Sequence, residues 1–466
     1  MRLLKVKKMN FNFLKTSKRN LTEGSMLKAL IALAVPVVFA NLLQTAYQLI
    51  DTFWVGRIGG DAVASVTLAF PIIFLMIALG GGLAAAGAIL VAQYKGKRDY
   101  KMIDFVAGQA FSMTLFNSVI ITVAGYFAAQ PLLELMGAEG AVLVGATQYL
   151  EISFLGTVFM YGFLVFQWLM NGVGDVVRPM LIVLSTVLLN LILDPLFIFG
   201  YGSFEGMGVS GAALATVITQ AVAAIIGFVL LFKRTYGVRL VVSMMKPDFK
   251  YIAKMFKLGI PASMEQAMRA FGFAVLAFLV ASFSSDVIAA YGIGIRILSF
   301  IIIPTLGLAM ATSTLVGQNI GAGKPERAQY TVKLAAMISF FLLTGLGVFA
   351  FFFSYDLVAA FVPGEPVVIA KGGQMIRIMA LSFGFIGLQH VINGAFRGAG
   401  KTLTSMIISL IAFWVLTLPL AYILSKHTDM AEVGIWWAFP IANVIASILA
   451  VIWFIFGDWK KKSILE

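Results

Sequence analysis

The chain has 466 residues, of which 61% are hydrophobic and only 12% are charged, and its mean hydropathy is +0.97. A soluble globular protein has about half apolar and about a quarter charged residues, so this composition leaves too few polar side chains for a water-facing surface. The sequence therefore indicates a membrane protein with several spans. It contains no cysteine and only two histidines, which excludes disulfides and thiolate chemistry and makes an imidazole-built metal centre improbable.

Apolar stretches long enough to cross a bilayer as helices follow one another along the whole chain. We expect twelve spans, at about 27–55, 61–90, 103–129, 141–169, 179–200, 208–232, 255–284, 287–317, 328–354, 368–394, 402–425 and 432–457. A closed barrel would need short strands that alternate with period two, and no stretch of this sequence does so. The predicted fold class is an all-α integral membrane protein with twelve transmembrane helices.

Basic residues gather in the N-terminal arm, the even-numbered connections and the C-terminal tail, whereas the odd-numbered connections carry mostly acidic residues. Basic connections stay on the cytoplasmic side, so we expect a multi-pass protein of the cell membrane with both termini cytoplasmic. The net charge of +13 is then explained by topology and by contact with anionic lipid, not by nucleic-acid binding. The first span is too long for a signal peptide, and we expect it to stay uncleaved.

The sequence contains an internal duplication. Residues 36–93 align with residues 261–318 at a fixed shift of 225 without a gap, and residues 171–175 align with 397–401. Each repeat holds six spans, so both copies enter the membrane from the same side and are related by a pseudo-twofold axis along the membrane normal. The predicted domains are a basic arm (1–25), an N-lobe (26–233), a cytoplasmic inter-lobe loop (234–254), a C-lobe (255–457) and a basic tail (458–466).

Polar side chains at membrane depth mark a candidate ion site in the first repeat. Asp194 lies in an apolar run with no basic residue nearby in sequence, and Asn190 stands one turn earlier on the same helix face. Thr216 on the following span adds a hydroxyl oxygen, and Asp51 closes a polar stripe on the first span. Carboxylate, amide and hydroxyl oxygens suit a proton or a hard monovalent cation such as Na⁺. An interfacial Asp51 and a Thr216 bonded to its own backbone are the structural alternatives.

The second repeat lacks these carboxylates, because Asp51 aligns with Leu276 and Thr216 with Ala442. It has instead Glu265 and Arg269 at i, i+4, which form either a structural ion pair or a second coupling or substrate site. The candidate cavity or gating residues are Pro36, Gln44, Tyr47, Gln48, Asn171, Glu265, Gln266 and Arg269, followed by Arg296, Gln389, His390 and Asn393. His390 is either a packed imidazole or a proton relay, and Pro36 offers a helix kink.

Several stretches taken together resemble the multidrug and toxic compound extrusion (MATE) transporters over nearly the whole chain. They are Ala34-Val35-Pro36, residues 44–56, residues 171–175, Asn190-Leu191-Ile192-Leu193-Asp194-Pro195, residues 208–213, Gly259-Ile260-Pro261 and residues 318–323. The resemblance implies two six-helix lobes around a central cavity. It also implies export of organic cations or amphipathic compounds against an inward proton or sodium gradient.

The resemblance also carries over an ion site. Asp51, Asn190, Asp194 and Thr216 match the N-lobe cation site of the branch that resembles DinF-type and archaeal members. The C-lobe pattern of NorM-type members fits less well, because the span around Gln389 lacks the expected carboxylate.

Other functions fit the sequence less well. A lipid-linked oligosaccharide flippase of the same superfamily usually has extra spans and a more cationic cavity. Residues 172–175 match the GxGD signature of intramembrane aspartyl proteases, but Asp175 lies beside Arg178 at the end of a span. Residues 400–402 lack the first glycine and the strand of a P-loop. We therefore expect a monomeric transporter and not an enzyme, with no cofactor, that exchanges a cationic or amphipathic small molecule for protons or sodium.

Overall fold

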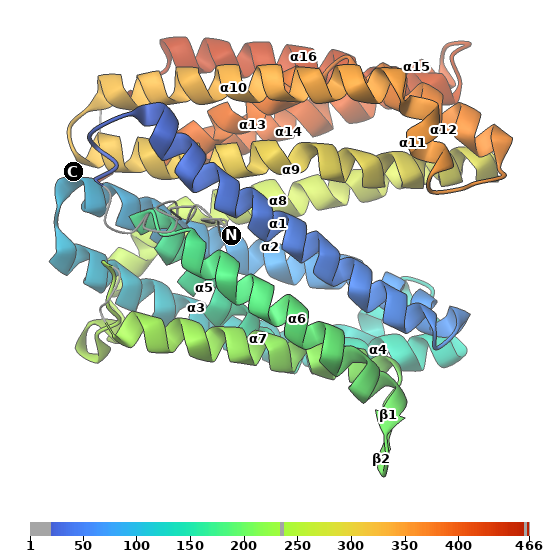
Figure 1. Ribbon diagram of the computed structural model, residues 1–466, viewed down its shortest axis with the longest axis horizontal. Helices are drawn as coiled ribbons and strands as arrows, with labels where there is room; N and C mark the ends of the chain where they lie inside the picture. The colour runs from blue at the N-terminus through green and yellow to red at the C-terminus, as the bar shows by residue number, and fades with distance from the viewer. Residues whose placement is uncertain (1–19, 234–236, 461–463, 466) are drawn as a thin grey trace, which may run out of the picture.

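The computed structural model describes residues 20–233, 237–460 and 464–465, and these residues are almost entirely helical (Figure 1). The basic arm is thus described only from Asn20 onward. Residues 234–236 of the inter-lobe loop, and 461–463 and 466 of the basic tail, also lie outside the described residues.

The first half of the chain forms the N-lobe. Its elements are α1 (Met26–Gly56), α2 (Gly60–Lys97), α3 (Tyr100–Leu135), α4 (Gly140–Leu155), α5 (Thr157–Val173), α6 (Val177–Phe199), the strands β1 (Gly200–Tyr201) and β2 (Phe204–Glu205), and α7 (Val209–Phe232). The strands form a short antiparallel hairpin, which the hydropathy pattern did not predict because it lies in a polar connection. A 3₁₀ turn, η3 (Val242–Met245), leads into the second half.

The second half forms the C-lobe, coloured yellow-green to red in Figure 1. Its elements are α8 (Phe249–Ala281), α9 (Ser285–Gly321), α10 (Pro325–Phe352), α11 (Ser354–Ala359), α12 (Pro366–Ala380), α13 (Phe383–Gly398), α14 (Thr402–Leu410), the π-helix η4 (Ile411–Thr417), α15 (Leu418–Lys426), α16 (Glu432–Phe456) and the 3₁₀ turn η5 (Asp458–Lys460). The repeat is visible in these bounds, because α2 and α9, and likewise α3 and α10, begin 225 residues apart.

The twelve predicted spans are present, but two of them are bent. Within the described residues, ten helical stretches are long and apolar enough to cross a membrane, with α14, η4 and α15 taken as one. The other two spans are the pairs α4–α5 and α12–α13, which bend by 52° and 55°. Hydropathy counts apolar residues and does not detect a bend, so the sequence predicted both pairs as single spans. The large apolar side chains on the outside, such as Phe127 and Phe278, suit contact with lipid.

Helix α1 crosses from one lobe to the other. Leu30 and Leu33 in its first half are fully buried in a hydrophobic cluster with Leu315 of α9 and Ile392 of α13. Val55 at its far end packs instead in a cluster of N-lobe residues. The first half of α1 therefore belongs by packing to the C-lobe.

Helix α8, the repeat equivalent of α1, makes the reciprocal crossing. Met255 in its first half packs with Leu90 of α2 and Phe166 of α5, in the core of the N-lobe. Leu276 near its end packs with Met375 of α12 inside the C-lobe. Each lobe therefore receives the first half of a helix from the other, whereas the domain boundaries at 233 and 255 remain predictions drawn from the sequence alone.

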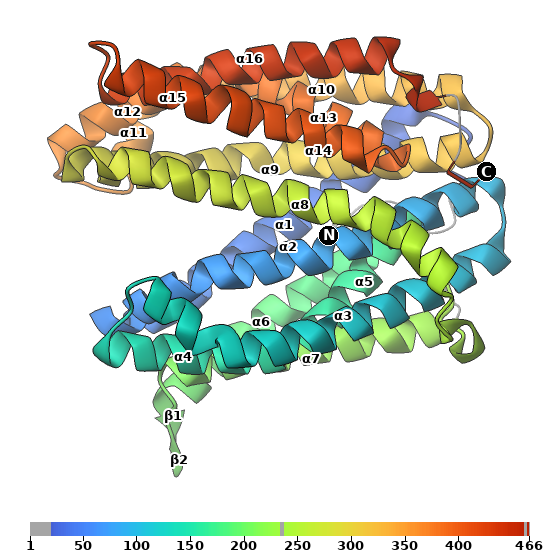
Figure 2. The same ribbon diagram turned by 180° about the vertical axis from the view of Figure 1, so that it is seen from behind.

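The two lobes meet at the end of the molecule where α2 ends and α10 begins, which we call the basic end because Lys97, Arg98, Lys324 and Arg327 lie there. Figures 1 and 2 show α2 and α9 approaching each other at this end, whereas α4 and α12 stand apart at the opposite end. The helices of the two lobes are therefore farther apart at the end opposite the basic end.

Reciprocal hydrogen bonds close the basic end. Gln93 Nε2 donates to the carbonyl oxygen of Gly398 at 3.2 Å, and Gln318 Nε2 donates to that of Gly172 at 2.9 Å. The repeat alignment pairs Gln93 with Gln318 and Gly172 with Gly398, so one bond is the pseudosymmetric copy of the other. We call these two bonds the glutamine latch.

Two glycines permit the close approach of α2 and α9 beside the glutamine latch. A Cβ atom on Gly96 would overlap the carbonyl oxygen of Gln318, and a Cβ atom on Gly321 would overlap that of Gln93. Gly96 and Gly321 are themselves repeat equivalents. The duplication has therefore produced two equivalent contacts in which the backbone of α2 lies directly against the backbone of α9.

Candidate ion and substrate sites

The polar residues of the N-lobe come together between α1, α6 and α7. Asp51 is 9% exposed, and Asn190 and Asp194 are fully buried on α6. Asn190 Nδ2 donates a 2.6 Å hydrogen bond to Asp194 Oδ1. The hydroxyl of Tyr47 on α1 donates to Thr216 Oγ1 of α7 at 3.1 Å. Residues that the sequence grouped across separate spans thus form one cluster, which we call the N-lobe site.

Two members of the N-lobe site were missing from the prediction. Thr219 Oγ1 lies 3.0 Å from the Tyr47 hydroxyl, and the buried Tyr149 of α4 lies near enough to Asp51 and Asp194 for their charges to act on it. Thr219 could have been found, because it lies three residues after Thr216 on the same helix face. Tyr149 gives no signal in the sequence, since an aromatic residue in an apolar span usually packs against its neighbours.

The N-lobe site contains buried oxygen atoms that accept no hydrogen bond. Among the described residues, Asp51 Oδ1, Asn190 Oδ1 and Asp194 Oδ2 are buried and have no hydrogen-bond partner. The two carboxylates also interact electrostatically with each other, and within the described chain neither forms an ion pair with lysine or arginine. A buried acceptor without a donor is costly. The site therefore fits a proton or a small cation, for which these oxygens are suitable ligands.

Other residues of the predicted set lie outside the N-lobe site. Gln44 and Gln48 are exposed, and Pro36 is buried where α1 crosses between the lobes. Asn171 lies in the contact between the lobes, where its Nδ2 is 3.4 Å from Met310 Sδ and its carbonyl oxygen accepts from Thr314.

Glu265 in the C-lobe forms ion pairs and hydrogen bonds with other residues besides its predicted partner, Arg269. Its pair with Arg269 exists, but at a long 3.4 Å, whereas Arg397 of α13 approaches Oε1 to 3.0 Å. Ser405 donates to Oε2 at 2.9 Å, and Ser409 donates to Oε1 at 3.0 Å. Arg397 sits at the end of a span, so the sequence read it only as a topology signal, and its role depends on α13 packing beside α8.

A cavity of about 810 Å³ opens between the lobes. Its walls come mainly from α8, α9, α13, η4 and α16 of the C-lobe, with one wall from α2 of the N-lobe. Of the predicted cavity residues, Arg269, Gln389, His390 and Asn393 line it. Gln266 does not, because its amide group faces Gly81 of α2, and Arg296 is exposed elsewhere.

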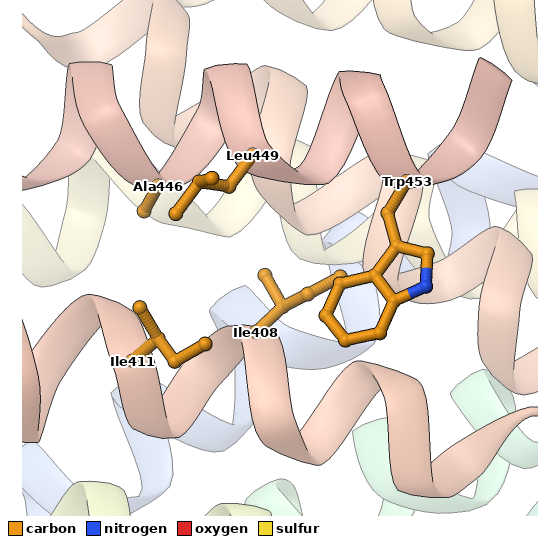
Figure 3. A pocket seen from close by; sticks show the side chains of 5 residues that line it. All are labelled: Ile408, Ile411, Ala446, Leu449 and Trp453. Carbon is orange, nitrogen blue, oxygen red and sulfur yellow. The ribbon is translucent and has the colours of Figure 1, made fainter. Parts of the chain in front are cut away.

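A second, much smaller hollow of about 50 Å³ lies between α14, η4 and α16 (Figure 3). Its walls are Ile408, Ile411, Ala446, Leu449 and Trp453. It is lined by apolar groups and is too small for a drug-sized molecule. We regard it as a packing defect between two helices.

Asp175 pairs with a basic residue that follows it closely in the chain. It is 1% exposed and forms an ion pair with Arg178, as its position in the sequence suggested. Residues 396–402 run from helix α13 into helix α14 and contain no strand, so the context of a P-loop is missing.

These features define a class of protein: a duplicated, twelve-span helical membrane protein whose two lobes close at one end and open around a cavity at the other. The MatE family model matches residues 36–196 and 261–423, once in each repeat. The chain therefore belongs to the MatE family of multidrug and toxic compound extrusion transporters.

Individual relatives agree with this assignment. The chain is 29% identical to the "Probable multidrug resistance protein YpnP" of Bacillus subtilis (strain 168), over 94% of this chain and 97% of that protein. A MATE protein solved "in complex with MaL6" superposes with a TM-score of 0.89 at 27% identity, covering 96% of this chain and all of that one. An "outward-facing conformation of a multidrug resistance MATE family transporter of the MOP superfamily" gives 0.88 at 27% identity, covering 95% and 98%.

Proposed function

We propose that this protein exports amphipathic small molecules across the cell membrane in exchange for protons or sodium ions, which bind at the N-lobe site. The observation that carries the proposal is the set of three buried oxygen atoms without a donor, on Asp51, Asn190 and Asp194. A proton or Na⁺ would supply the missing positive partner. The ion is a transported species in this scheme and not a resident cofactor.

The direction of the open cavity supports export. The positive-inside rule assigns the basic end to the cytoplasm, with both termini on that side. In this proposal the glutamine latch closes the cytoplasmic end, and the conformation described is an outward-open state, from which substrate leaves the cell. Each chain contains a complete cavity and a complete N-lobe site, and we propose that it works as a monomer.

Helix α1 links the ion site to the lobe contact. Asp51 lies on the part of α1 that packs on the N-lobe, whereas Leu30 and Leu33 pack on the C-lobe. Neutralising Asp51 removes a charge from the C-terminal part of α1 and so changes how that part packs on the N-lobe. A resulting movement of α1 reaches the C-lobe contact through the turn at Pro36. An ion can drive transport in this way only if it binds the two states of the protein with unequal affinity.

The same superfamily includes flippases of lipid-linked oligosaccharides, but the observations favour export of small molecules. Several relatives that match nearly the whole chain are named multidrug proteins, and the described residues contain twelve spans. The preference for cations that the resemblance implies stays a prediction.

Transport in proteoliposomes tests the proposal. Protein reconstituted with a fluorescent amphipathic dye should move the dye under either an imposed proton gradient or an imposed sodium gradient, which identifies the coupling ion. Asp51→Asn and Asp194→Asn should each lower gradient-driven transport by about tenfold or more, because each removes the charge that holds the ion. Asp61→Asn, an exposed carboxylate on α2, serves as the matched control. Normal transport by either site variant at normal reconstitution would overturn the proposal.

A further inference from the structure

The cavity between the lobes differs in charge from what the family resemblance implies. Among its described lining residues, none is an aspartate or glutamate, and Arg269 is the only one with a permanent charge. Most of the wall is apolar and rich in phenylalanine, including Phe70, Phe271 and Phe413. The carboxylates Asp51 and Asp194 are not part of this wall.

The charge of Arg269 is only partly compensated. Glu265, its nearest acid, has a side chain that is 2% exposed, and it is bound more closely by Arg397 and by the hydroxyls of Ser405 and Ser409. Two arginines and one glutamate leave one positive charge in this cluster. The side chain of Arg269 is 38% exposed, and its Nη2 contact to Glu265 is 3.4 Å, long for a hydrogen bond between charged groups.

His390 does not supply a negative partner either. Its Nδ1 lies 2.9 Å from the carbonyl oxygen of Ile386, and that contact requires Nδ1 to donate. Its Nε2 lies 3.4 Å from Arg269 Nη1, so this nitrogen faces a donor and must accept. An imidazole that donates from Nδ1 and accepts at Nε2 is neutral. The excess charge of Arg269 therefore faces the cavity.

The irregular helix η4, which packs beside the helix that carries Arg269, shapes part of the remaining wall. The π-helix η4 turns Ala412, Phe413 and Thr417 toward the cavity, and Thr417 Oγ1 bonds back to the Ala412 carbonyl at 2.8 Å. Single π-helical turns inside α-helices occur frequently at functional sites. An aromatic wall beside one guanidinium can hold a flat or hydrocarbon body next to an acidic group.

We propose that the cavity binds the anionic group of an amphipathic substrate, a carboxylate or a phosphate on an aromatic or hydrocarbon body, and that Arg269 pairs with this group. The proposal rests on the proposed function in assuming that the cavity carries the exported molecule, and it replaces the predicted cationic substrate with an anionic one. An organic cation would meet an uncompensated positive charge in an apolar cavity, whereas an anion would neutralise it.

Binding of two matched probes to the purified full chain tests the proposal without any ion gradient. Both probes carry a dansyl fluorophore on a hexyl chain, ending in a carboxylate in one and in a trimethylammonium group in the other. The protein should bind the carboxylate probe about tenfold or more tightly than the ammonium probe. Arg269→Gln should remove this preference. Arg377→Gln, which takes an arginine from another part of the C-lobe, should keep it.

Two further variants keep the test decisive if Arg269→Gln folds poorly. Arg269→Lys keeps the charge but loses the planar fork, so the carboxylate probe should bind more weakly and still be preferred. Gln389→Glu places a carboxylate in the same cavity and should shift the preference toward the ammonium probe. Equal or tighter binding of the ammonium probe to the unmodified protein would overturn the proposal.

Competition identifies the source of the anionic group. Displacement of the carboxylate probe by octyl phosphate supports a free small molecule, and displacement by nanodiscs of phosphatidylglycerol but not phosphatidylcholine supports a lipid headgroup. Failure of both competitors to displace it would contradict anion binding in the cavity. Gradient-driven export of the ammonium probe, with no binding of the carboxylate probe, would uphold antiport and overturn only the present inference.

Discussion

Three buried acidic side chains differ in how they are hydrogen-bonded in the two lobes. Glu265 accepts hydrogen bonds from Arg397, Ser405 and Ser409, so both of its oxygens are occupied. Asp51 and Asp194 each keep a buried oxygen without a donor. A carboxylate whose two oxygens already accept hydrogen bonds has fewer lone pairs left for an ion. We therefore interpret Glu265 as a structural group and the two aspartates as the ion ligands.

Replacing Glu265 tests this difference. Glu265→Gln keeps the shape of the side chain but leaves Arg397 and Arg269 without a negative partner, so we expect a loss of about 3 kcal/mol in stability. Thermal unfolding of the purified protein in detergent measures the loss. Glu365→Gln, an exposed acid at the start of α12, is the matched control. A stable Glu265→Gln protein that has lost its ion dependence would instead make Glu265 a coupling residue.

Arg397 and Tyr149 mark the limit of what single residues reveal in the sequence. The isolated aspartates were predictable, because a charge in an oily span is costly and has few structural uses. Arg397 was not, since a basic residue at the end of a span is explained by topology alone. Its true partner becomes apparent only once α13 is placed beside α8.

At the level of the helix, the crossing of α1 and α8 is the feature with the largest consequence. Each helix has its first half in one lobe and its second half in the other, and each carries a proline, Pro36 or Pro261, near the change. Proline removes one backbone hydrogen bond and makes that turn easier to bend. A movement of the lobes against each other must therefore be absorbed by these two helices.

Removing the proline of α1 tests this role. Pro36→Ala restores a backbone hydrogen bond and stiffens the helix, so we expect higher thermal stability together with transport slowed about tenfold. Stopped-flow transport in proteoliposomes and thermal unfolding measure the two effects. Pro131→Ala in α3, a helix that stays within the N-lobe, is the control for the substitution itself. Faster transport by Pro36→Ala would show that bending at this position is not required.

Hydropathy predicted where the helices lie along the chain, but it did not predict which helices pack against each other. The twelve spans, the duplication and the lobe order follow from apolar length, charge alternation and internal alignment. The bends at α4–α5 and α12–α13 and the exchange of the first halves of α1 and α8 do not, because lipid and protein are equally apolar neighbours for a leucine. The glutamines of the latch were aligned in the sequence, but their hydrogen bonds depend on how the lobes meet.

For the whole molecule, the glutamine latch holds the two lobes together at the basic end. Its two hydrogen bonds are buried, cross between the lobes and lie on either side of the pseudo-twofold axis. Each is worth about 1 kcal/mol, and two separate bonds add to about 2 kcal/mol. The latch thus sets the balance between the two orientations by roughly thirtyfold.

The double variant Gln93→Ala with Gln318→Ala should shift that balance toward the state that is open at the basic end by roughly thirtyfold, and each single variant by about fivefold. The chain has no native cysteine. Spin labels on Lys97→Cys and Glu326→Cys, exposed on opposite lobes at the basic end, therefore report the separation directly. Gln109→Ala, a buried glutamine bonded to the η3 segment, is the control. An unchanged distance distribution in the double variant would exclude a role for the latch.

The exchange of helix halves also constrains how the protein is made. When the ribosome has completed α7, the core around Leu90 and Phe166 still lacks Met255, and the first turns of α1 still lack Leu315 of α9. During translation the N-lobe therefore stays in the bilayer without the first half of α8 in its core. If the two halves are produced as separate polypeptides, each half should accordingly fold stably only when the other half is produced with it.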